Sequence, residues 1–408
     1  MRWLGENPFH TLLLLTEKPG QWAAWQIAPV PAILATTAGL LWAGVTGQPG
    51  WGWAVALGLA AFALADWALL AALPCRGHSF GAVQPPWLGL VLFRWLIALF
   101  ALLFAARWLL PTLVILILLQ VFISAMAAYG TLVEPFRLQV TELRVPTARG
   151  LNPGRPLRIV QLSDLHLERC TRRERALPAL VSDQNPDLIV LTGDFLNTSY
   201  NKDPRAVADL EALLAQLHAS AGIYAVWGTM EVDLPQVLRP VFDELGIVVL
   251  ENQAVEVVCE GQRLWLMGIS PTRDLDADGA ELDRLVAESG SGESGPAESG
   301  SGDPSYGGVV RLLLYHLPDL MPQAVAAGVD LYLAGHTHGG QWRVPGFGAI
   351  LTSSRFWKRY EAGAYREGNT QLYVSRGIGL EGFGTPRARF FCPPEVVSIT
   401  LVGLGEAQ

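Results

Sequence analysis

Two carboxylates and four imidazoles in this sequence stand just beyond short hydrophobic runs, where they could bind metal ions. They are Asp164, His166, Asp194, His316, His336 and His338. Carboxylate and imidazole ligands without thiolate suit Mn²⁺ first, and also Fe or Zn²⁺, rather than a structural zinc site. Two such ions joined by one carboxylate can clamp a phosphoryl group and activate water for in-line attack. The residue types therefore favour hydrolysis of a phosphoester or diphosphate on two divalent ions, with Asp194 as the bridging ligand.

The local spacing of these residues supports a shared site. Asp164 and His166 are two positions apart, which places them on one face of an extended segment. Asp194 follows a glycine that lets the backbone approach closely. The run 335–340, Gly-His-Thr-His-Gly-Gly, puts two imidazoles on one glycine-flanked loop. Four of the seven histidines thus follow strand-like runs, which is more order than chance would give.

Alternating strand-like and helix-like segments would hold these residues in place. A first strand is expected at 139–145, helices at 173–184 and 205–219, and buried strands at 158–162, 188–192, 223–227, 309–314 and 331–334. This alternation is typical of a layered α/β fold, whose sites lie at the carboxyl ends of strands. A short amphipathic helix at 277–287 precedes residues 288–308, which are rich in Gly, Ser and Glu. We expect that stretch to be a disordered surface insertion, with a flexible lid as the alternative.

The order of the motifs resembles the calcineurin-like metallophosphoesterases over residues 155–402. The segments 334–341, 374–379 and 392–400 are similar in sequence and order to those of the membrane-anchored bacterial branch. The resemblance implies a four-layer α/β/β/α sandwich with two metals at the strand ends. It implies that Asp164, His166, Asp194 and His338 bind the first metal. It assigns Asp194, His316 and His336 to the second metal.

One motif departs from that family. Gly228-Thr229-Met230-Glu231 stands where the family has Gly-Asn-His followed by an acid. Thr229 offers a weaker ligand to the second metal than an amide, and Met230 cannot protonate a leaving group. This favours a diphosphate or activated phosphodiester substrate, or a degenerate site. Glu231 is a candidate substitute acid or ligand.

Four basic residues near these motifs have two interpretations each. Arg376 could hold a substrate phosphate, or it could form a structural ion pair. Arg355, Lys358 and Arg359 could meet lipid headgroups or substrate phosphate, or they could form a solvated face.

The first third of the chain has a different composition. Residues 1–133 hold eight of the 66 charged residues, and none occurs from 19 to 65. Four membrane-spanning helices are expected at 25–46, 51–73, 87–106 and 110–129, which is too much apolar chain for a cleaved signal peptide. Residues 134–154 then form a linker with the first strand. Asp66 and Arg94 lie inside two spans, where a buried ion pair is one interpretation and a substrate path the other.

Charge also bears on location and partners. Arg2, Lys18, Arg76, Arg137 and Arg144 flank one side of the spans and Arg107 alone flanks the other, which predicts a cytoplasmic rear domain on a bacterial inner membrane. The net charge of −8 offers no broad basic surface for nucleic acid. The four cysteines have no close spacing and are expected to be unpaired thiols.

We therefore expect a membrane-anchored phosphohydrolase whose partners are membrane lipids and a phosphorylated or diphosphate lipid. The alternative is a non-catalytic metal-binding or ligand-binding module, motivated by Thr229 and Met230. Transport through the spans is a third, weaker hypothesis, because transporters carry more polar residues in their spans.

Overall fold

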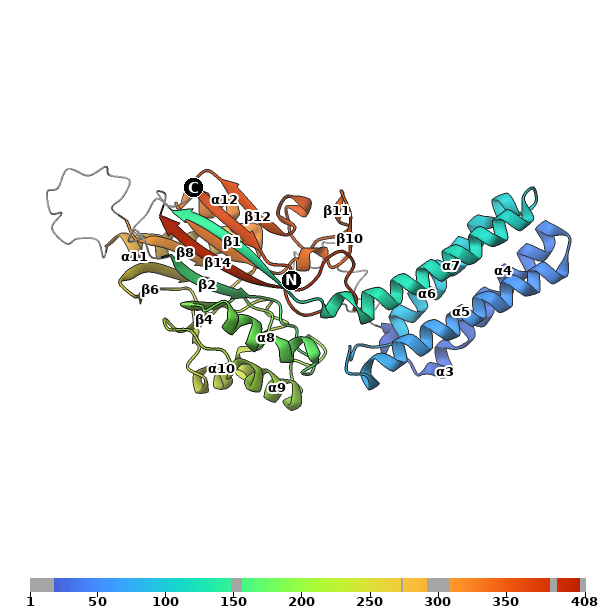
Figure 1. Ribbon diagram of the computed structural model, residues 1–408, viewed down its shortest axis with the longest axis horizontal. Coiled ribbons are helices and arrows are strands. Elements are labelled where there is room, and N and C mark those ends of the chain that lie inside the picture. The colour runs from blue at the N-terminus through green and yellow to red at the C-terminus, as the bar shows by residue number, and fades with distance from the viewer. Residues whose placement is uncertain (1–17, 148–155, 273, 292–307, 382–386, 404–408) are drawn as a thin grey trace. The chain divides into compact units, whose positions relative to one another are not determined.

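A computed structural model describes residues 18–147, 156–272, 274–291, 308–381 and 387–403 (Figure 1). The described chain forms two compact units. The first ends at Val133, and Glu381, Arg387 and Ala388 group with it. The second runs from Glu134 to Leu380 and continues from Arg389. Each unit has its own apolar core.

The first unit consists of helices: the 3₁₀ turn η1 (Lys18–Gln21) and α3 (Ala24–Ile27), α4 (Pro29–Thr46), α5 (Pro49–Cys75), α6 (Gln84–Ala105) and α7 (Leu109–Leu132). Four segments among the described residues are long and apolar enough to cross a membrane, and each overlaps an expected span. Proline in the first turn of α4, α5 and α6 suits helix starts, since proline lacks the amide that would be unpaired there. The expected four apolar helices are confirmed.

A polar cluster lies inside this apolar bundle. Arg94 donates hydrogen bonds to both carboxylate oxygens of Asp66, at 2.7 and 2.8 Å. Its remaining donors reach the backbone and side-chain oxygens of Gln120 and the Ser124 hydroxyl. Asp66 and Arg94 are 2% and 1% exposed. The buried ion pair is thus the interpretation that the structure supports.

The second unit is built on two six-stranded sheets. The first has the order β1-β14-β2-β3-β4-β5 and the second β12-β13-β9-β8-β7-β6. The strands of the first are β1 (Gln139–Thr147), β2 (Leu157–Leu162), β3 (Leu188–Leu191), β4 (Ile223–Ala225), β5 (Val248–Val249) and β14 (Glu395–Gly403). Those of the second are β6 (Gln253–Cys259), β7 (Gln262–Gly268), β8 (Val310–Leu314), β9 (Leu331–Ala334), β12 (Gly363–Glu367) and β13 (Thr370–Val374).

Helices cover the outer face of each sheet. Helices α8 (Arg172–Asp183), α9 (Pro204–Leu214) and α10 (Pro235–Glu244) share a core with the first sheet, while α11 (Leu275–Ser291) and α12 (Met321–Ala326) share one with the second. A third apolar core, which includes Ile159, Leu266 and Leu333, lies between the sheets. Side chains alternate along each strand, so each sheet contributes apolar residues to its outer core and to the core between the sheets. The four-layer α/β/β/α sandwich is therefore confirmed (Figure 1).

Two boundaries differ from expectation. Strand β1, expected at 139–145, continues to Thr147 and pairs with β14 along its full length. Helix α11 continues to Ser291, although Glu288–Ser291 were expected to belong to the disordered insertion. The buried Ser289 hydroxyl donates to the Val286 carbonyl and accepts a hydrogen bond from Arg311, which holds this last turn. Residues 292–307 of the insertion lie outside the described residues.

Candidate metal centre

The ends of four strands meet at one site. Asp164 and His166 follow β2, Asp194 follows β3, His316 follows β8 and His336 follows β9. His338 begins the short 3₁₀ turn η5 (His338–Gly340). The strands β2 and β3 belong to one sheet and β8 and β9 to the other, so both sheets contribute ligands. The expectation that strand ends collect these side chains agrees with the structure.

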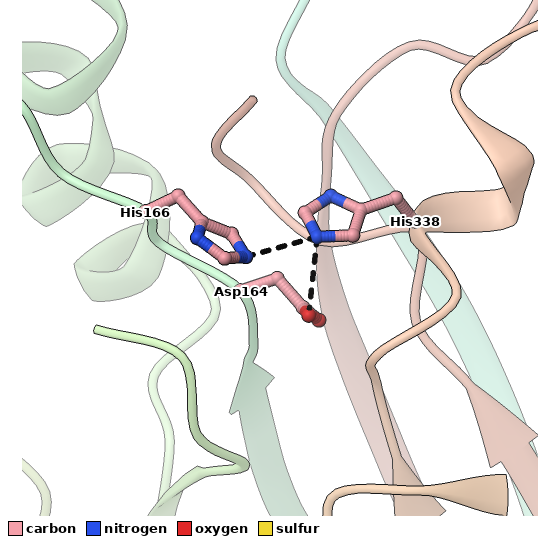
Figure 2. Close-up of side chains that lie close together, drawn as sticks. All are labelled: Asp164, His166 and His338. Carbon is pink, nitrogen blue, oxygen red and sulfur yellow. Dashed lines mark hydrogen bonds and ion pairs between the residues drawn. The ribbon is translucent and has the colours of Figure 1, made fainter. Parts of the chain in front are cut away.

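The first group contains Asp164, His166 and His338 (Figure 2). One ligand atom from each lies within 4.8 Å of the others. The Nε2 atoms of the two imidazoles are 3.0 Å apart, and Nε2 of His338 is 3.4 Å from Oδ1 of Asp164. All three side chains are buried. Two nitrogen donors and one oxygen donor thus converge on one point away from water.

The second group contains Asp194, His316 and His336, again with ligand atoms within 4.8 Å of one another. Oδ2 of Asp194 is 3.2 Å from Nε2 of His316. Nδ1 of His316 lies 2.7 Å from the carbonyl of Thr192, which fixes the ring so that Nε2 faces the site. This outer contact is of the kind that orients metal-binding histidines.

Asp194 stands between the two groups. Its Oδ2 atom, 3.2 Å from His316, is also 3.4 Å from Nε2 of His166, a member of the first group. Backbone bonds hold the loops in register: the Asp164 amide donates to the Gly193 carbonyl, and the His166 amide to the Asp194 carbonyl. One carboxylate oxygen therefore faces both groups.

Backbone strain is concentrated at these residues. Five of them have a positive φ: Asp164 (48°), His166 (37°), Asp194 (57°), His336 (69°) and His338 (51°). Only eleven non-glycine residues in the described chain have a positive φ. Such conformations cost free energy and persist where the surrounding structure enforces them, as at functional sites. The fold thus places these side chains at a cost in local backbone energy.

Two glycines make the close packing possible. A Cβ atom on Gly335 would lie 2.0 Å from Oγ of Ser163 and 2.3 Å from Oδ2 of Asp164. A Cβ atom on Gly228 would lie 2.2 Å from Oδ1 of Asp194. Any larger residue at either position would push a carboxylate away, so these glycines allow the two loops to approach.

Burial and charge set the protonation of the imidazoles. Burial lowers the pKa of His336 to about 3. Burial, with help from His166 and Arg389, lowers the pKa of His338 well below its usual 6.5. Burial acts the same way on His316, but the Asp194 and Asp164 carboxylates outweigh it and raise its pKa to about 9. Neutral imidazoles at His336 and His338 are in the form that binds a metal ion.

The donor set fits two divalent cations. Each group offers one carboxylate and two imidazoles, which is a combination typical of Mn²⁺, Fe and Zn²⁺ centres. The two imidazole Nε2 atoms lie 3.0 Å apart, and a cation between them would let both nitrogens act as lone-pair donors, whereas a direct hydrogen bond requires one of them to carry the proton. The geometry therefore suits a pair of ions joined by Asp194.

The motif at 228–231, which departs from the family, places only the Thr229 side chain beside a metal group. The Thr229 amide donates to Oδ1 of Asp194 at 2.6 Å, and its hydroxyl to Oδ2 at 3.3 Å. Thr229 therefore lies beside the second group. Met230 is 61% exposed and Glu231 is also exposed, and neither belongs to the two groups. The roles of Thr229 and Glu231 remain predictions.

An unexpected residue organises this corner of the site. The buried carboxylate of Asp233 accepts hydrogen bonds from the amides of Asp194, Phe195 and Gly228, at 2.7–2.8 Å. Burial, together with the Asp194 charge, raises its pKa to about 7. In the sequence, Asp233 is recognisable only as an acid two positions after Glu231. The sequence does not indicate which of the two carboxylates binds the loop amides. Ser163, which donates to Oδ2 of Asp164 at 2.6 Å, was also missed.

The remaining predicted residues lie around the site. Arg376 forms an ion pair with Glu395 at 2.6 Å, and its side chain is 23% exposed. This contact agrees with the structural interpretation, and a role in holding substrate phosphate stays a prediction. Arg355 and Arg359 are exposed, while Lys358 donates to the carbonyls of Phe347 and Ala349. None of these four belongs to the two metal groups.

Comparison with known proteins supports a family. The model for calcineurin-like phosphoesterases matches residues 157–340. Phosphodiesterase YaeI of Escherichia coli is 31% identical over 254 residues, which cover 60% of this chain and 83% of that protein. The Bacillus subtilis metallophosphoesterase YkuE is 28% identical, with 67% of this chain and 88% of the relative covered. The pyrophosphatase LpxG of Chlamydia muridarum is 27% identical, with 64% and 89% covered. The strand-end motifs, the sandwich and these relatives together establish that the chain belongs to the calcineurin-like phosphoesterase family.

Proposed function

We propose that this protein is a membrane-anchored, metal-dependent phosphohydrolase that cleaves a phosphodiester or pyrophosphate bond of a lipid-linked or membrane-surface substrate. The observation that carries the proposal is the position of Asp194 Oδ2, which is 3.4 Å from His166 in one group and 3.2 Å from His316 in the other. A carboxylate with this placement can serve two ions at once. Family membership makes hydrolysis the expected class of reaction.

The ligands divide between two ions. Asp164, His166 and His338 would hold the first and His316 and His336 the second, with Asp194 shared. The Thr229 hydroxyl would complete the second set. When bound, two divalent ions supply charge that polarises the phosphoryl oxygens and lowers the pKa of an attacking water. Mn²⁺ is the first candidate, with Fe and Zn²⁺ as alternatives.

The substrate class follows from the missing proton donor. Met230 cannot transfer a proton, so the leaving group must depart without much acid assistance. A diphosphate or an activated phosphodiester does so, whereas an alkyl phosphate does not. The name of the relative LpxG, UDP-2,3-diacylglucosamine pyrophosphatase, points the same way. The exposed Glu231 is a candidate acid if its loop moves toward the substrate.

The helical unit supports a substrate within the membrane. Four helices that can cross a bilayer exceed what a water-soluble substrate requires. The Lys and Arg distribution in the sequence favours a cytoplasmic phosphoesterase unit on a bacterial inner membrane. A phosphorylated or diphosphate lipid is then within reach of the site.

The test uses the full chain purified in detergent. With Mn²⁺ it should hydrolyse bis-p-nitrophenyl phosphate, whose leaving group needs no acid. Asp194→Asn should abolish turnover and lower the bound metal. Asp243→Asn, an exposed residue of α10, is the matched control. Equal turnover in Asp194→Asn and the control would overturn the proposal.

A second candidate function is a non-catalytic metal-binding or ligand-binding module. The exposure of Met230, at a position where the family has histidine, favours it. In that case metal analysis would give about one ion per chain. No phosphodiester or diphosphate would be turned over, and Asp194→Asn would change only metal content.

A further inference from the structure

A small hairpin beside the metal-binding loop exposes an apolar surface. Its strands are β10 (Arg343–Val344) and β11 (Gly348–Ala349). Residues 344–351, called here the apolar hairpin, read Val-Pro-Gly-Phe-Gly-Ala-Ile-Leu and contain no polar side chain. Val344, Phe347, Ile350 and Leu351 are 44%, 59%, 46% and 38% exposed. A run of exposed apolar residues is unfavourable in water and marks a contact surface.

The strand register shows which face points outward. Arg343 and Ala349 are paired, and both contact Glu361: Nη2 of Arg343 is 2.9 Å from Oε1, and the Ala349 amide donates to Oε2 at 3.1 Å. Ala349 is fully buried, whereas Val344 and Ile350 are exposed, as the alternation of side chains along extended chain predicts. One face of the hairpin is therefore anchored to the domain, and the other is apolar and exposed. The hairpin forms a two-stranded sheet separate from the two large ones (Figure 1).

The segment that contains the apolar hairpin has a net positive charge. The segment 341–367 contains five basic residues and two acidic ones, in a chain with a net charge of −8. Glu361 pairs with Arg343 and Lys358, and Glu367 pairs with Arg359, which leaves a net charge of +3 on the segment. Nζ of Lys358 lies 3.8 Å from the centre of the Phe347 ring. Trp357, in the turn η6 (Trp357–Tyr360), is 51% exposed. Exposed apolar and aromatic residues beside a net positive charge are typical of surfaces that enter the headgroup region of a bilayer.

We propose that the apolar hairpin docks the phosphoesterase unit into the surface of an anionic phospholipid bilayer. The occupant is a membrane because the segment's excess of basic residues complements anionic headgroups. In addition, the chain passes from α7 into the phosphoesterase unit at Glu134, so the bilayer that holds the helices is always near. A second copy of this acidic chain would have to supply its own apolar, acidic face.

Docking would set the depth of the metal centre. The Ser353 hydroxyl donates to the His336 carbonyl at 3.0 Å, and Arg343 donates to the Gly339 carbonyl at 3.1 Å. These bonds tie the apolar hairpin and its flank to the loop that carries His336 and His338. With Phe347 among the lipids, that loop lies near headgroup level, where a lipid phosphate or diphosphate is found. This consequence rests on the proposed function, but the docking itself does not.

The docking is tested by spin labels on the full chain in nanodiscs of phosphatidylethanolamine and phosphatidylglycerol. Labels go on Phe347→Cys, or on the control Val258→Cys, a 60% exposed residue of β6. Cys75 and Cys170 are first replaced by serine, because they are exposed or half-buried and would also take the label. Cys259 and Cys392 are buried and are kept. If the apolar hairpin docks, the spin label at 347 should collide frequently with oxygen and rarely with a water-soluble nickel chelate. The label at 258 should show the reverse. Equal nickel accessibility at both positions would overturn the proposal. So would spin–spin broadening at 347 that vanishes on dilution with unlabelled chain, since that indicates self-association.

Activity gives an independent readout. The double variant Phe347→Ser/Ile350→Ser should lower hydrolysis of a diphosphate lipid in bilayers by about tenfold, the loss expected from an apolar contact of this size. Hydrolysis of bis-p-nitrophenyl phosphate should be unchanged. Equal loss on both substrates would contradict docking. If wild type hydrolyses neither substrate while the label at 347 still reports lipid, the proposed function fails and the docking stands.

Discussion

The buried carboxylate of Asp233 accepts a hydrogen bond from the backbone amide of Asp194 at 2.8 Å. The same carboxylate binds the amides of Phe195 and Gly228, so one side chain ties the loop after β3 to the loop after β4. Asp194 takes its positive φ of 57° at this junction. The position of the shared carboxylate therefore depends on a residue that is not itself a candidate ligand.

Replacing Asp233 by alanine should destabilise the protein and loosen metal binding. The change leaves buried amides without an acceptor, and each such group costs about 1–3 kcal/mol. Urea unfolding of the phosphoesterase unit, followed in detergent, measures the loss. Metal analysis should show fewer ions per chain. Asp243→Ala is the exposed control. Wild-type stability and metal content in Asp233→Ala would show that the three hydrogen bonds are dispensable.

Removing one imidazole from either group should remove one ion and leave the other. His338→Ala affects the first group and His316→Ala the second, since the two groups have no histidine in common and only Asp194 lies beside histidines of both. Mass spectrometry of metals in the purified protein should therefore give half the wild-type content in each variant. Asp194→Asn should lower both. Loss of all metal from either histidine variant would mean that the ions bind as an inseparable pair.

Restoring the missing histidine should widen the range of leaving groups. Met230→His places a proton donor at the position where the family carries one, and general acid catalysis is worth about 100-fold or more on a poor leaving group. Rates on phenyl and p-nitrophenyl phosphodiesters should be compared, with Met230→Leu as the control. The phenyl ester should gain and the p-nitrophenyl ester should not. A uniform change on both esters would argue for an effect on binding instead.

Replacing one partner of the Asp66–Arg94 ion pair should destabilise the helical unit more than replacing both. Arg94→Leu leaves the buried Asp66 carboxyl group without its partner, and breaking such a pair costs about 3–5 kcal/mol. The double variant Asp66→Leu/Arg94→Leu should recover much of that loss. Thermal denaturation in detergent measures both. Metal-dependent turnover should persist in the double variant, whereas a substrate path through the spans would require the pair.

A capping residue of the phosphoesterase unit should contribute stability that depends on pH. Burial opposes ionisation of Glu174, but Arg173 and the Thr171 hydrogen bonds outweigh it and hold its pKa below the ordinary 4.5. A lowered pKa in the folded state stabilises the protein above about pH 4.5, and this contribution is lost as the pH falls through the folded-state value. Glu174→Gln should therefore be less stable than wild type at pH 7, with the difference shrinking in acid. Unfolding curves with a chelator present remove the effect of metal loss. A gap that is constant from pH 7 to about pH 3 would contradict the assignment.

Periodicity and strand ends made the architecture predictable. Short apolar runs such as 158–162 and 331–334 predicted β2 and β9, and the polar residues that follow them converge as expected. Apolar length alone predicted the four long helices. These features depend on local sequence patterns, which is why the sequence was sufficient.

Contacts between distant or irregular segments were not predictable. The choice of Asp233 over Glu231 as the residue that binds loop amides depends on turn geometry. The pairing of Arg376 with Glu395 depends on where β14 enters the sheet. The two-residue strands β10 and β11 are too short for any periodic pattern. In each case tertiary packing decides, and a sequence read residue by residue does not encode it locally.

The pairing of β1 with β14 has a consequence for biosynthesis. β14 lies between β1 and β2, so the first sheet stays divided until residues 395–403 have left the ribosome. By then the helices of the first unit have long been synthesised and can already be in the bilayer. Until β14 is synthesised, the nascent phosphoesterase segment has two unpaired strand edges, which are prone to aggregation. A stop codon before β14 would therefore yield an inserted chain whose unpaired strand edges expose it to proteolysis, rather than a slightly weakened enzyme.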